Sequence, residues 1–533
     1  MTIQQAISIA LKNISSHGDT DIFPFPFENL IFAHESERSR PVIEELNSSF
    51  FDKLGTDTPQ TIASLTQVGY TGFRWATLID PFWNAYYLAL VVSIADKIEA
   101  QRLPESEHSV FSYRFHWQDD TNKLFKDSSW ADFKAQCLVN SAEHPVVIQT
   151  DIADFYPRIY HHRIDNALRR LPDVGDTPKR IMNLLGSFTK NVSYGLPIGG
   201  PASRMLAELA LNDVDKLLAR NQVTFCRYAD DYAIFCESKE DAYRTLVFLA
   251  EKLANEGLVL QKKKTRILSS EEFREVAELL GPTVADAISS DEQKLINISL
   301  RFDPYSPTAV QDYDSLKEAI GQIDILGILG REIAKTNVNA SVARHAVSAI
   351  SLLQQEQQEG AVRMLLDPTN LMTLAPVFVT VMRVIKSLYP GSSEPYKQLI
   401  DSSLCYLYES RFPLLAVEVN LAYFLQAFAG GRSAQKEAVL VKIFKDPSAS
   451  PLIRRLVILT MAKWECHYWL SDIKGTYHNM TTYEQRAFIL ASYSLGDEGR
   501  HWREHQKTGW QSPEKLIRDW YASRSQAGHG MPI

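Results

Sequence analysis

The stretch Phe225–Cys236, FCRYADDYAIFC, decides how the first half of this chain is interpreted. Two aspartates, Asp230 and Asp231, stand side by side between two apolar, aromatic-rich runs that predict a β-hairpin. Aspartate is common in turns, so a solvated turn is one explanation. Adjacent carboxylates at the tip of a hairpin also form a platform for Mg²⁺, which prefers oxygen ligands.

The composition of the 533 residues is that of a globular protein, with 45% hydrophobic and 23% charged residues. The chain does not begin with a basic, apolar leader, and its longest apolar runs are too short to span a bilayer. These features predict a cytoplasmic protein that does not contact a membrane. The five cysteines are scattered without a CxxC pair, which predicts reduced thiols and no zinc site.

The net charge of −8 is unevenly distributed. Residues 1–300 contain 31 Lys and Arg against 41 Asp and Glu, whereas residues 301–533 contain 25 against 23. A protein that neutralises many phosphates of a long duplex usually carries a basic surplus. We therefore expect any bound nucleic acid to occupy a restricted channel.

The chain changes character near residue 285. Before it, β-rich runs alternate with amphipathic helices, which predicts an α+β domain over residues 1–285. The Pro-punctuated residues 286–314 predict a linker, and helical periodicity predicts an all-α domain over residues 315–533. Three segments of this second domain look alike and resemble the second helix of HEAT-type repeats, at residues 342–353, 451–464 and 484–496.

A third carboxylate, Asp151, ends an apolar strand in VVIQTDIADFY (Val146–Tyr156). It can face Asp230 if the two strands are neighbours in one sheet. Two converging carboxylates together with triphosphate oxygens suit two Mg²⁺ ions, for which Mn²⁺ can substitute. Two such ions can activate a hydroxyl nucleophile and stabilise a pyrophosphate leaving group.

Together these segments resemble the palm of reverse transcriptases, in which a first aspartate motif precedes a YxDD motif. Two further segments continue the order of that family. Gly195–Leu209, GLPIGGPASRMLAEL, resembles a Gly-rich and Pro-rich loop that enters a helix, although Ile198 replaces the usual Gln and Arg204 the usual Pro. In Leu258–Leu268, LVLQKKKTRIL, Lys264 matches the lysine that precedes a threonine.

The resemblance implies roles for individual residues. It assigns metal binding to Asp151, Ile152 and Asp230, with Asp231 in support, so these three aspartates are the expected catalytic residues. Tyr156, five residues after Asp151, takes the position of the steric gate that excludes a 2′-hydroxyl. The full set of implied dNTP contacts is Arg74, Arg114, Ile152, Phe155, Tyr156, Gly199 and Lys264, of which Lys264 is expected to meet the triphosphate or protonate the leaving group.

The C-terminal half of the chain indicates which class of reverse transcriptase the sequence resembles. No zinc-knuckle, HNH endonuclease or ribonuclease H pattern and no convincing basic thumb comes after Lys264, and a helical domain begins instead. This layout resembles the abortive-infection (Abi) reverse transcriptases of bacterial phage defence, most closely the P2-like prophage branch. The resemblance implies an α+β palm and fingers without a usual thumb, followed by an all-α HEAT-like domain. It further implies a homo-oligomer that joins dNTPs without a template. Because priming starts from a side-chain hydroxyl of the protein, the single-stranded DNA product would be covalently attached.

Three other interpretations remain open. An RNA-templated reverse transcriptase of retron or group II intron type shares the palm but needs an RNA partner and a thumb. In GRHWREHQ (Gly499–Gln506), Arg500 and His505 fit the Arg-x4-His pattern of HEPN ribonucleases, where acid–base chemistry cuts RNA. A non-enzymatic scaffold is disfavoured by the intact carboxylates, because clustered like charges destabilise a fold unless metals compensate.

Overall fold

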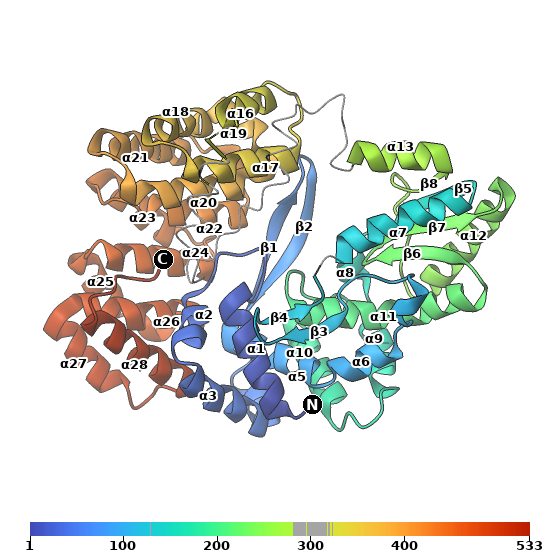
Figure 1. Ribbon diagram of the computed structural model, residues 1–533. Helices are drawn as coiled ribbons and strands as arrows, with labels where there is room; N and C mark the ends of the chain where they lie inside the picture. The colour runs from blue at the N-terminus through green and yellow to red at the C-terminus, as the bar shows by residue number, and fades with distance from the viewer. Residues whose placement is uncertain (128, 281–294, 296–316, 318–319, 322) are drawn as a thin grey trace. The chain divides into compact units, whose positions relative to one another are not determined.

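The computed structural model describes residues 1–127, 129–280, 295, 317, 320–321 and 323–533 (Figure 1). The chain divides into two compact units. The first contains Met1–Ala63 and Ala76–Glu278, and the second contains Ser64–Trp75 and Leu279–Ile533. The predicted linker, residues 286–314, lies outside the described residues apart from residue 295, so the domain limits 1–285 and 315–533 stay predictions.

A four-stranded antiparallel sheet forms the centre of the first unit. Its strand order is β6-β7-β5-β8, and these strands are β5 (Val146–Asp151), β6 (Thr224–Tyr228), β7 (Asp231–Cys236) and β8 (Arg266–Ser269). The strands are rich in branched and aromatic side chains, which fit a pleated, buried surface. Because β5 lies between β7 and β8, its last residue lies beside the first residue of β7.

Helices cover both faces of this sheet. On one face, α7 (Ser129–Glu143) and α13 (Ser270–Leu280) join an apolar core that includes Cys226. Successive residues of a strand point to opposite faces, so the neighbouring Arg227 points to the other face, where it bonds to α11 (Pro201–Arg220). Another helix that packs on the sheet is α12 (Lys239–Asn255).

The N-terminal helices of the first unit pack around α5 (Pro81–Ser93), which is buried along most of its length. The Asp80 side chain caps this helix, since it accepts a hydrogen bond of 3.0 Å from the backbone N–H of Phe82. Next to α5 lies α1 (Ile3–His17). The other elements of this unit are α2 (Phe27–His34), α3 (Ser36–Ser48), α4 (Phe50–Thr56), α6 (Ala95–Gln101), β3 (Phe115–Gln118), β4 (Lys123–Phe125), α8 (Phe155–Arg158), α9 (His161–Arg169) and α10 (Thr177–Phe188).

The helices of the second unit stack in two layers. In one layer each helix packs on the next, in the order α17 (Ala340–Ala349), α20 (Phe378–Leu388), α22 (Glu418–Phe428), α24 (Pro451–Lys463), α26 (Thr482–Ala491) and α28 (Ser512–Gln526). The other layer includes α18 (Gln355–Leu366), α21 (Glu394–Glu409) and α23 (Ala434–Lys445). Three similar segments noted in the sequence supply α17, α24 and α26, all in the first layer. Further helices are α16 (Ile325–Ile333), α19 (Pro368–Thr373), α25 (His467–Lys474) and α27 (Gly496–Gln506).

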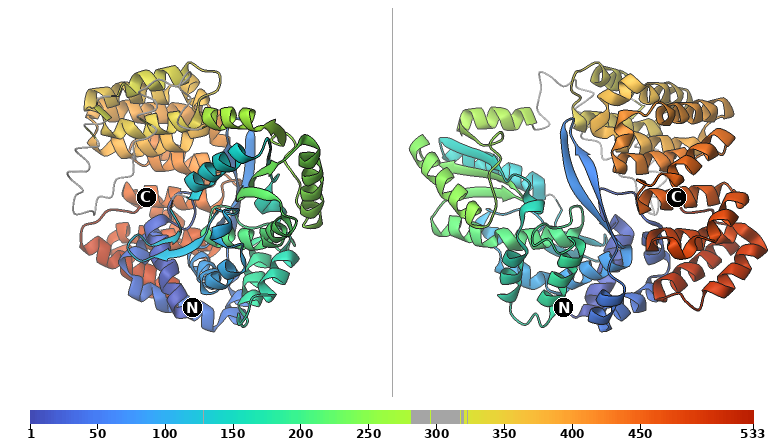
Figure 2. Two further views of the ribbon diagram at one scale, coloured as in Figure 1. Left: turned by 45° about the vertical axis from the view of Figure 1, so that its right-hand side comes forward. Right: turned by 180° about the vertical axis from the view of Figure 1, so that it is seen from behind.

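A long two-stranded ribbon, β1 (Thr61–Val68) and β2 (Gly72–Ile79), contributes its tip to the second unit (Figure 2). At the tip, the Tyr70 hydroxyl donates a hydrogen bond of 2.6 Å to the carbonyl of Thr373 and accepts one of 2.8 Å from the backbone N–H of Val338. Residues 64–75 therefore pack with the helices of the second unit, although they precede the sheet of the first unit in sequence. Among the described helices, none has the length and apolar character needed to cross a membrane.

Candidate active site

The three predicted carboxylates converge at one end of the sheet. In the register of β5 and β7, Asp151 lies directly opposite Asp231. The backbone N–H of Ile152 donates a hydrogen bond of 3.1 Å to the carbonyl of Asp230, which fixes the turn against the end of β5. From the sequence, a meeting of Asp151 and Asp230 is conditional on their strands being neighbours. Strands β5 and β7 are neighbours in the sheet, and Asp230 lies in the turn that leads into β7.

The turn between β6 and β7 contains only two residues, Ala229 and Asp230, because Tyr228 pairs with Asp231. Ala229 has a φ of 53°, in the left-handed region that non-glycine residues rarely adopt. Asp230 therefore lies at the tip of the hairpin, and Asp231 is the first residue of β7. A residue held in a disfavoured conformation beside clustered carboxylates marks this turn as a functional candidate.

The electrostatics show that negative charge gathers at this point. Burial, followed by repulsion from Asp151 and Asp231, raises the pKa of Asp230 from its usual value to about 7. Burial and the charge of Asp151 also raise the pKa of Asp231. Near neutral pH the clustered carboxylates therefore lower the stability of the folded chain, and a bound cation would reduce this loss of stability.

Lys264 lies beside these carboxylates, and its predicted contact with a triphosphate stays a prediction. Its Nζ donates a short hydrogen bond to Asp151 Oδ2. Two contacts on either side of Lys264 position it there. The N–H of Gln261 donates a 2.7 Å hydrogen bond to the carbonyl of Asp151, and the hydroxyls of Thr265 and Thr150 lie 2.7 Å apart. The hydrogen bond with Asp151 raises the pKa of Lys264, so this side chain is protonated at neutral pH.

A divalent cation fits the charge of this end of the sheet. In the part of the chain that the structure describes, no group of three or more His, Cys, Asp or Glu side chains is arranged to hold a metal ion by itself. Mg²⁺ usually takes one or two protein carboxylates and completes its shell with waters and substrate phosphates. Asp151 and Asp230 match that limited donor set. The pKa of Asp230 is raised first by burial and then by the neighbouring carboxylates, and a bound cation would offset both effects.

The predicted gate, Tyr156, lies on the short helix α8 close to the carboxylates. Its charged and polar neighbours include Tyr113, Arg204 and Asp230, and burial raises the pKa of its hydroxyl well above the usual value. The adjacent Phe155 is buried, with its ring centre 5.2 Å from that of Tyr156. Tyr156 is therefore a wall of the site, whereas Phe155 belongs to the packing behind it.

Gly199 is covered by the N-terminal segment around Thr20, a contact that the sequence did not reveal. It has a φ of 113°, and a Cβ atom built there would lie 2.5 Å from the Thr20 Oγ1 atom. The next residue of the N-terminal segment, Asp21, accepts a 2.7 Å hydrogen bond from the Arg204 guanidinium. Asn84 holds the same segment through a 3.4 Å hydrogen bond to the carbonyl of Asp19. An acidic stretch of chain thus occupies the space in front of this loop.

The structure corrects the expectation for Arg114. Its guanidinium is buried and donates hydrogen bonds to Glu99 Oε1 (2.7 Å), the Leu103 carbonyl (2.8 Å) and the Val110 carbonyl (3.0 Å). These partners belong to the chain itself, so Arg114 is not a nucleotide contact. Arg74 is exposed on the part of β2 that belongs to the second unit, and its predicted contact with a triphosphate stays a prediction.

The proposed ribonuclease pair is also corrected. Arg500 and His505 both lie on α27, five residues apart, which separates their side chains by roughly 140° around the helix axis. Both are exposed, and Arg500 forms a 2.9 Å ion pair with Asp497. The two side chains do not share one helical face, so this arrangement does not support acid–base chemistry between them.

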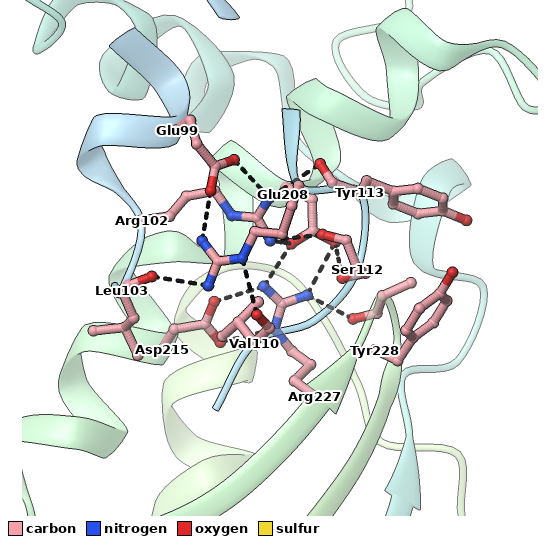
Figure 3. Close-up of polar contacts among 12 residues, drawn as sticks. Glu99, Arg102, Leu103, Val110, Ser112, Tyr113, Glu208, Asp215, Arg227 and Tyr228 are labelled. Carbon is pink, nitrogen blue, oxygen red and sulfur yellow. Dashed lines mark hydrogen bonds and ion pairs between the residues drawn. The ribbon is translucent and has the colours of Figure 1, made fainter. Parts of the chain in front are cut away.

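Sequence reasoning missed Arg227, the residue directly before the YxDD motif. It is completely buried, and its guanidinium bonds to Asp215 and Glu208 of α11 (Figure 3). The signal was present, because a charged residue inside the apolar run of FCRYADDYAIFC needs buried partners. Tyr113 was also missed: its ring centre lies 5.9 Å from that of Tyr228 and 5.2 Å from the guanidinium carbon of Arg204.

Comparison with known proteins agrees with this geometry. Residues 91–294 match the family described as reverse transcriptase (RNA-dependent DNA polymerase). The chain is 27% identical over 157 residues to the retron Ec86 reverse transcriptase of Escherichia coli, a match that covers 28% of this chain and 47%, about half, of that relative.

Solved structures of telomerase give weaker similarity. Telomerase from Candida albicans, solved with a TWJ fragment of telomeric RNA, is 10% identical with a TM-score of 0.29, over 67% of this chain and 70% of that one. Apo telomerase from Candida tropicalis is 10% identical with a TM-score of 0.31, over 71% and 73% of the two chains. Such TM-scores carry no argument about function. The family match and the meeting of the three carboxylates concern the same part of the chain, since residues 91–294, which match the reverse transcriptase family, contain Asp151, Asp230 and Asp231.

Proposed function

We propose that this chain is a DNA polymerase of the reverse transcriptase family that joins dNTPs without a template. The observation that carries the polymerase assignment is the meeting of Asp151, Asp230 and Asp231 at one end of the sheet, with Lys264 bonded to Asp151. A sheet end with three carboxylates and one ammonium group suits a substrate that brings its own phosphates and cations.

Each residue has a defined part in this proposal. Asp151 and Asp230, with the Ile152 backbone beside them, would hold two Mg²⁺ ions, and Asp231 would support the primer end. When bound, these ions lower the barrier to attack of a hydroxyl on the α-phosphate and stabilise the departing pyrophosphate. Lys264 is protonated and close enough to the carboxylates to give a proton to that leaving group. Tyr156 would exclude ribonucleotides by contact with the sugar.

Two observations support synthesis without a template. The segment at residues 19–21 covers Gly199, and Asp21 pairs with Arg204, so the loop is covered and its arginine is already engaged by a carboxylate of the chain. The first 300 residues also carry a surplus of acidic side chains. Both features disfavour a long template–primer duplex, because its phosphates need unpaired basic side chains for binding.

The wider biological role forms part of the same proposal. We place the chain with the Abi reverse transcriptases of phage defence, in which a protein hydroxyl starts a single-stranded DNA that stays covalently attached. The two-layer helical stack of the second unit supports a HEAT-like domain, since helix pairs that stack in order are the basis of such repeats. Homo-oligomer formation and a cytoplasmic location belong to this proposal as well.

The test uses purified protein with labelled dNTPs and Mg²⁺ or Mn²⁺, with no template or primer added. We expect labelled DNA that stays attached to the protein after the protein is denatured and that is released by proteinase. Mass spectrometry should find a DNA-linked peptide. The double variant Asp230→Asn/Asp231→Asn should fold and lose incorporation. Persisting incorporation in that variant would mean that the active site lies elsewhere.

A templated enzyme is the second candidate, because the retron Ec86 reverse transcriptase is 27% identical over 157 residues. This alternative predicts that the purified protein is inactive until RNA is added and that the product sequence is complementary to that RNA. Sequencing of products made with and without RNA separates the two candidates. Strict dependence on added RNA would exclude synthesis without a template.

A further inference from the structure

Among the non-glycine residues near the candidate site that have left-handed backbone conformations, two have carbonyls that accept hydrogen bonds from buried arginines. Ala229, in the metal-binding turn, has a φ of 53°, and Tyr113, whose ring approaches Tyr228, has a φ of 47°. Side chains disfavour this region of φ, so both conformations need support from the surrounding structure. The source of that support is visible behind the turn.

Arg227 holds the first of these residues. Its Nη1 donates a hydrogen bond of 2.9 Å to the carbonyl of Ala229. The same guanidinium is fixed by Asp215, through Nε–Oδ1 (2.8 Å) and Nη2–Oδ2 (2.6 Å), and by Glu208, through Nη2–Oε2 (2.8 Å) and Nη1–Oε1 (3.2 Å). A planar fork clamped by two carboxylates leaves the Ala229 carbonyl little freedom to move.

Arg102 holds the second residue and shares a counter-ion with the first. Its Nη1 donates a 3.1 Å hydrogen bond to the carbonyl of Tyr113, and its Nη2 lies 2.8 Å from Glu208 Oε2 (Figure 3). Glu208 is 1% exposed and also accepts a hydrogen bond from the Ser112 hydroxyl. One buried carboxylate on α11 thus links the two arginines that fix the two left-handed residues.

The charges of this network alternate. Arg114 contacts Glu99, Glu99 contacts Arg102, Arg102 contacts Glu208, Glu208 contacts Arg227, and Arg227 contacts Asp215. Replacement of a buried ion pair by apolar residues is often neutral or stabilising, so stability alone is a weak reason for such a network. The two hydrogen bonds that the network makes to backbone carbonyls, at Tyr113 and Ala229, are a stronger reason for its presence beside the site.

We propose that Arg227 is a positioning residue for Asp230, which acts through the Ala229 carbonyl, and that Glu208 couples it to Tyr113. This inference rests on the proposed polymerase function, since it concerns the same metal site. Arg227 does not contact the metal or the nucleotide. It sets the angle at which Asp230 leaves the turn, and therefore the affinity for the cation and the rate of the reaction.

The experiment compares Arg227→Lys with the matched control Arg114→Lys. Both replace a buried arginine of the same network, but Arg114 contacts Glu99, Leu103 and Val110 and no residue of the turn. Arg227→Lys keeps the positive charge but removes the guanidinium group, whose Nη1 donates the hydrogen bond to the Ala229 carbonyl. We expect the Mn²⁺ concentration for half-saturation, measured by calorimetry, to rise about tenfold in Arg227→Lys, a size typical for partners behind a metal ligand. The control should stay within about twofold of the wild type.

A rescue variant separates positioning from general stability. Glycine adopts positive φ without support, so Ala229→Gly in the Arg227→Lys background should recover at least about threefold of the lost Mn²⁺ affinity. Equal losses of affinity in Arg227→Lys and Arg114→Lys, or wild-type affinity in folded Arg227→Lys, would overturn the inference. If Arg227→Lys does not fold, Asp215→Asn, which weakens the clamp on Arg227, takes its place against the same control.

In this experiment the proposed polymerase function and the proposed role of Arg227 can be refuted independently of each other. A wild-type protein that incorporates no dNTP but binds Mn²⁺, with an affinity that depends on Arg227, would refute the polymerase and keep the positioning role. Active wild-type protein whose rate and Mn²⁺ affinity are unchanged by folded Arg227→Lys would keep the polymerase and refute the positioning role.

Discussion

At the scale of single residues, the site is defined by charge that the fold does not neutralise by itself. Asp230 and Asp231 both have a raised pKa because they are partly buried and repel Asp151 and each other. Lys264 compensates part of this charge through Asp151. A chain that keeps such a cluster carries a cost in stability, which is expected when the cluster serves binding rather than folding.

This cost gives a pH-dependent prediction for Asp230→Asn. The folded pKa of about 7 lies above the usual 3.8, so the folded state binds the proton more tightly and the contribution of Asp230 to stability falls as pH rises from about 4 to 7. In EDTA at pH 8, Asp230→Asn should therefore be more stable than wild type by roughly 1–3 kcal/mol, a range reduced for the partial exposure of this group. Thermal unfolding measures the difference, which should shrink at pH 5.

Mg²⁺ provides the control for that prediction. Added Mg²⁺ should raise the unfolding temperature of the wild type and leave Asp230→Asn nearly unchanged, since the variant lacks one ligand. A variant that is less stable than wild type in EDTA at pH 8 would contradict the assignment of Asp230 to a strained carboxylate cluster.

At the scale of elements, the loop before α11 and the N-terminal segment form one packed arrangement. Gly199 needs its positive φ and its missing side chain, because Thr20 occupies the space where a Cβ would lie. Asp21 and Arg204 then tie the two segments by an ion pair. The segment between α1 and α2 is thereby part of the site's surroundings, although it lies far from the palm motifs in sequence.

Gly199→Ala tests this packing. The added methyl group would meet the Thr20 hydroxyl at 2.5 Å and would also be strained at a φ of 113°. We expect a loss of about 1–3 kcal/mol in the free energy of unfolding. Gly55→Ala, inside α4, is the matched control, since a Cβ there meets no atom within 4 Å, and it should be neutral or stabilising by up to about 1 kcal/mol. Urea unfolding measures both, and equal effects would show that Thr20 does not pack on Gly199.

At the scale of the whole molecule, the chain crosses between its two units more than once. Residues 64–75 of the β1–β2 ribbon belong to the second unit, while the residues that precede and follow this segment belong to the first. Within the second unit, the Ser64 hydroxyl donates a 2.7 Å hydrogen bond to Glu418 Oε2, in addition to the Tyr70 contacts. The helical unit therefore includes a piece of the N-terminal half as a structural part.

Tyr70→Phe should loosen this connection. The change removes the hydroxyl that bonds to Thr373 and Val338, which should lower stability by about 1–3 kcal/mol if both backbone groups lose their partner. Hydrogen exchange should accelerate at residues 61–79 and around 338. Tyr406→Phe, at a tyrosine that is 59% exposed, is the control and should change neither measurement. Unchanged exchange in Tyr70→Phe would argue against the anchoring role of this hydroxyl.

Much of the candidate site could be predicted from the sequence because its parts are local patterns. Asp151, Asp230 and Lys264 each stand at a strand end or in a short loop, and a strand of apolar residues fixes where its last residue lies. The helical character of residues 325–526 likewise follows from periodicity. Arg114 was misassigned because a motif match does not show whether a guanidinium is free or surrounded by carbonyls and Glu99.

The sequence by itself indicated which chemistry is possible: paired carboxylates after apolar strands and a lysine beyond them. Only the tertiary structure decided how these groups are held. The order β6-β7-β5-β8 brings Asp151 opposite Asp231, and residues far apart in sequence, such as Glu208 and Arg227, meet behind the turn. The physical reason is that strand pairing and buried ion pairs depend on long-range contacts, which local propensity does not encode.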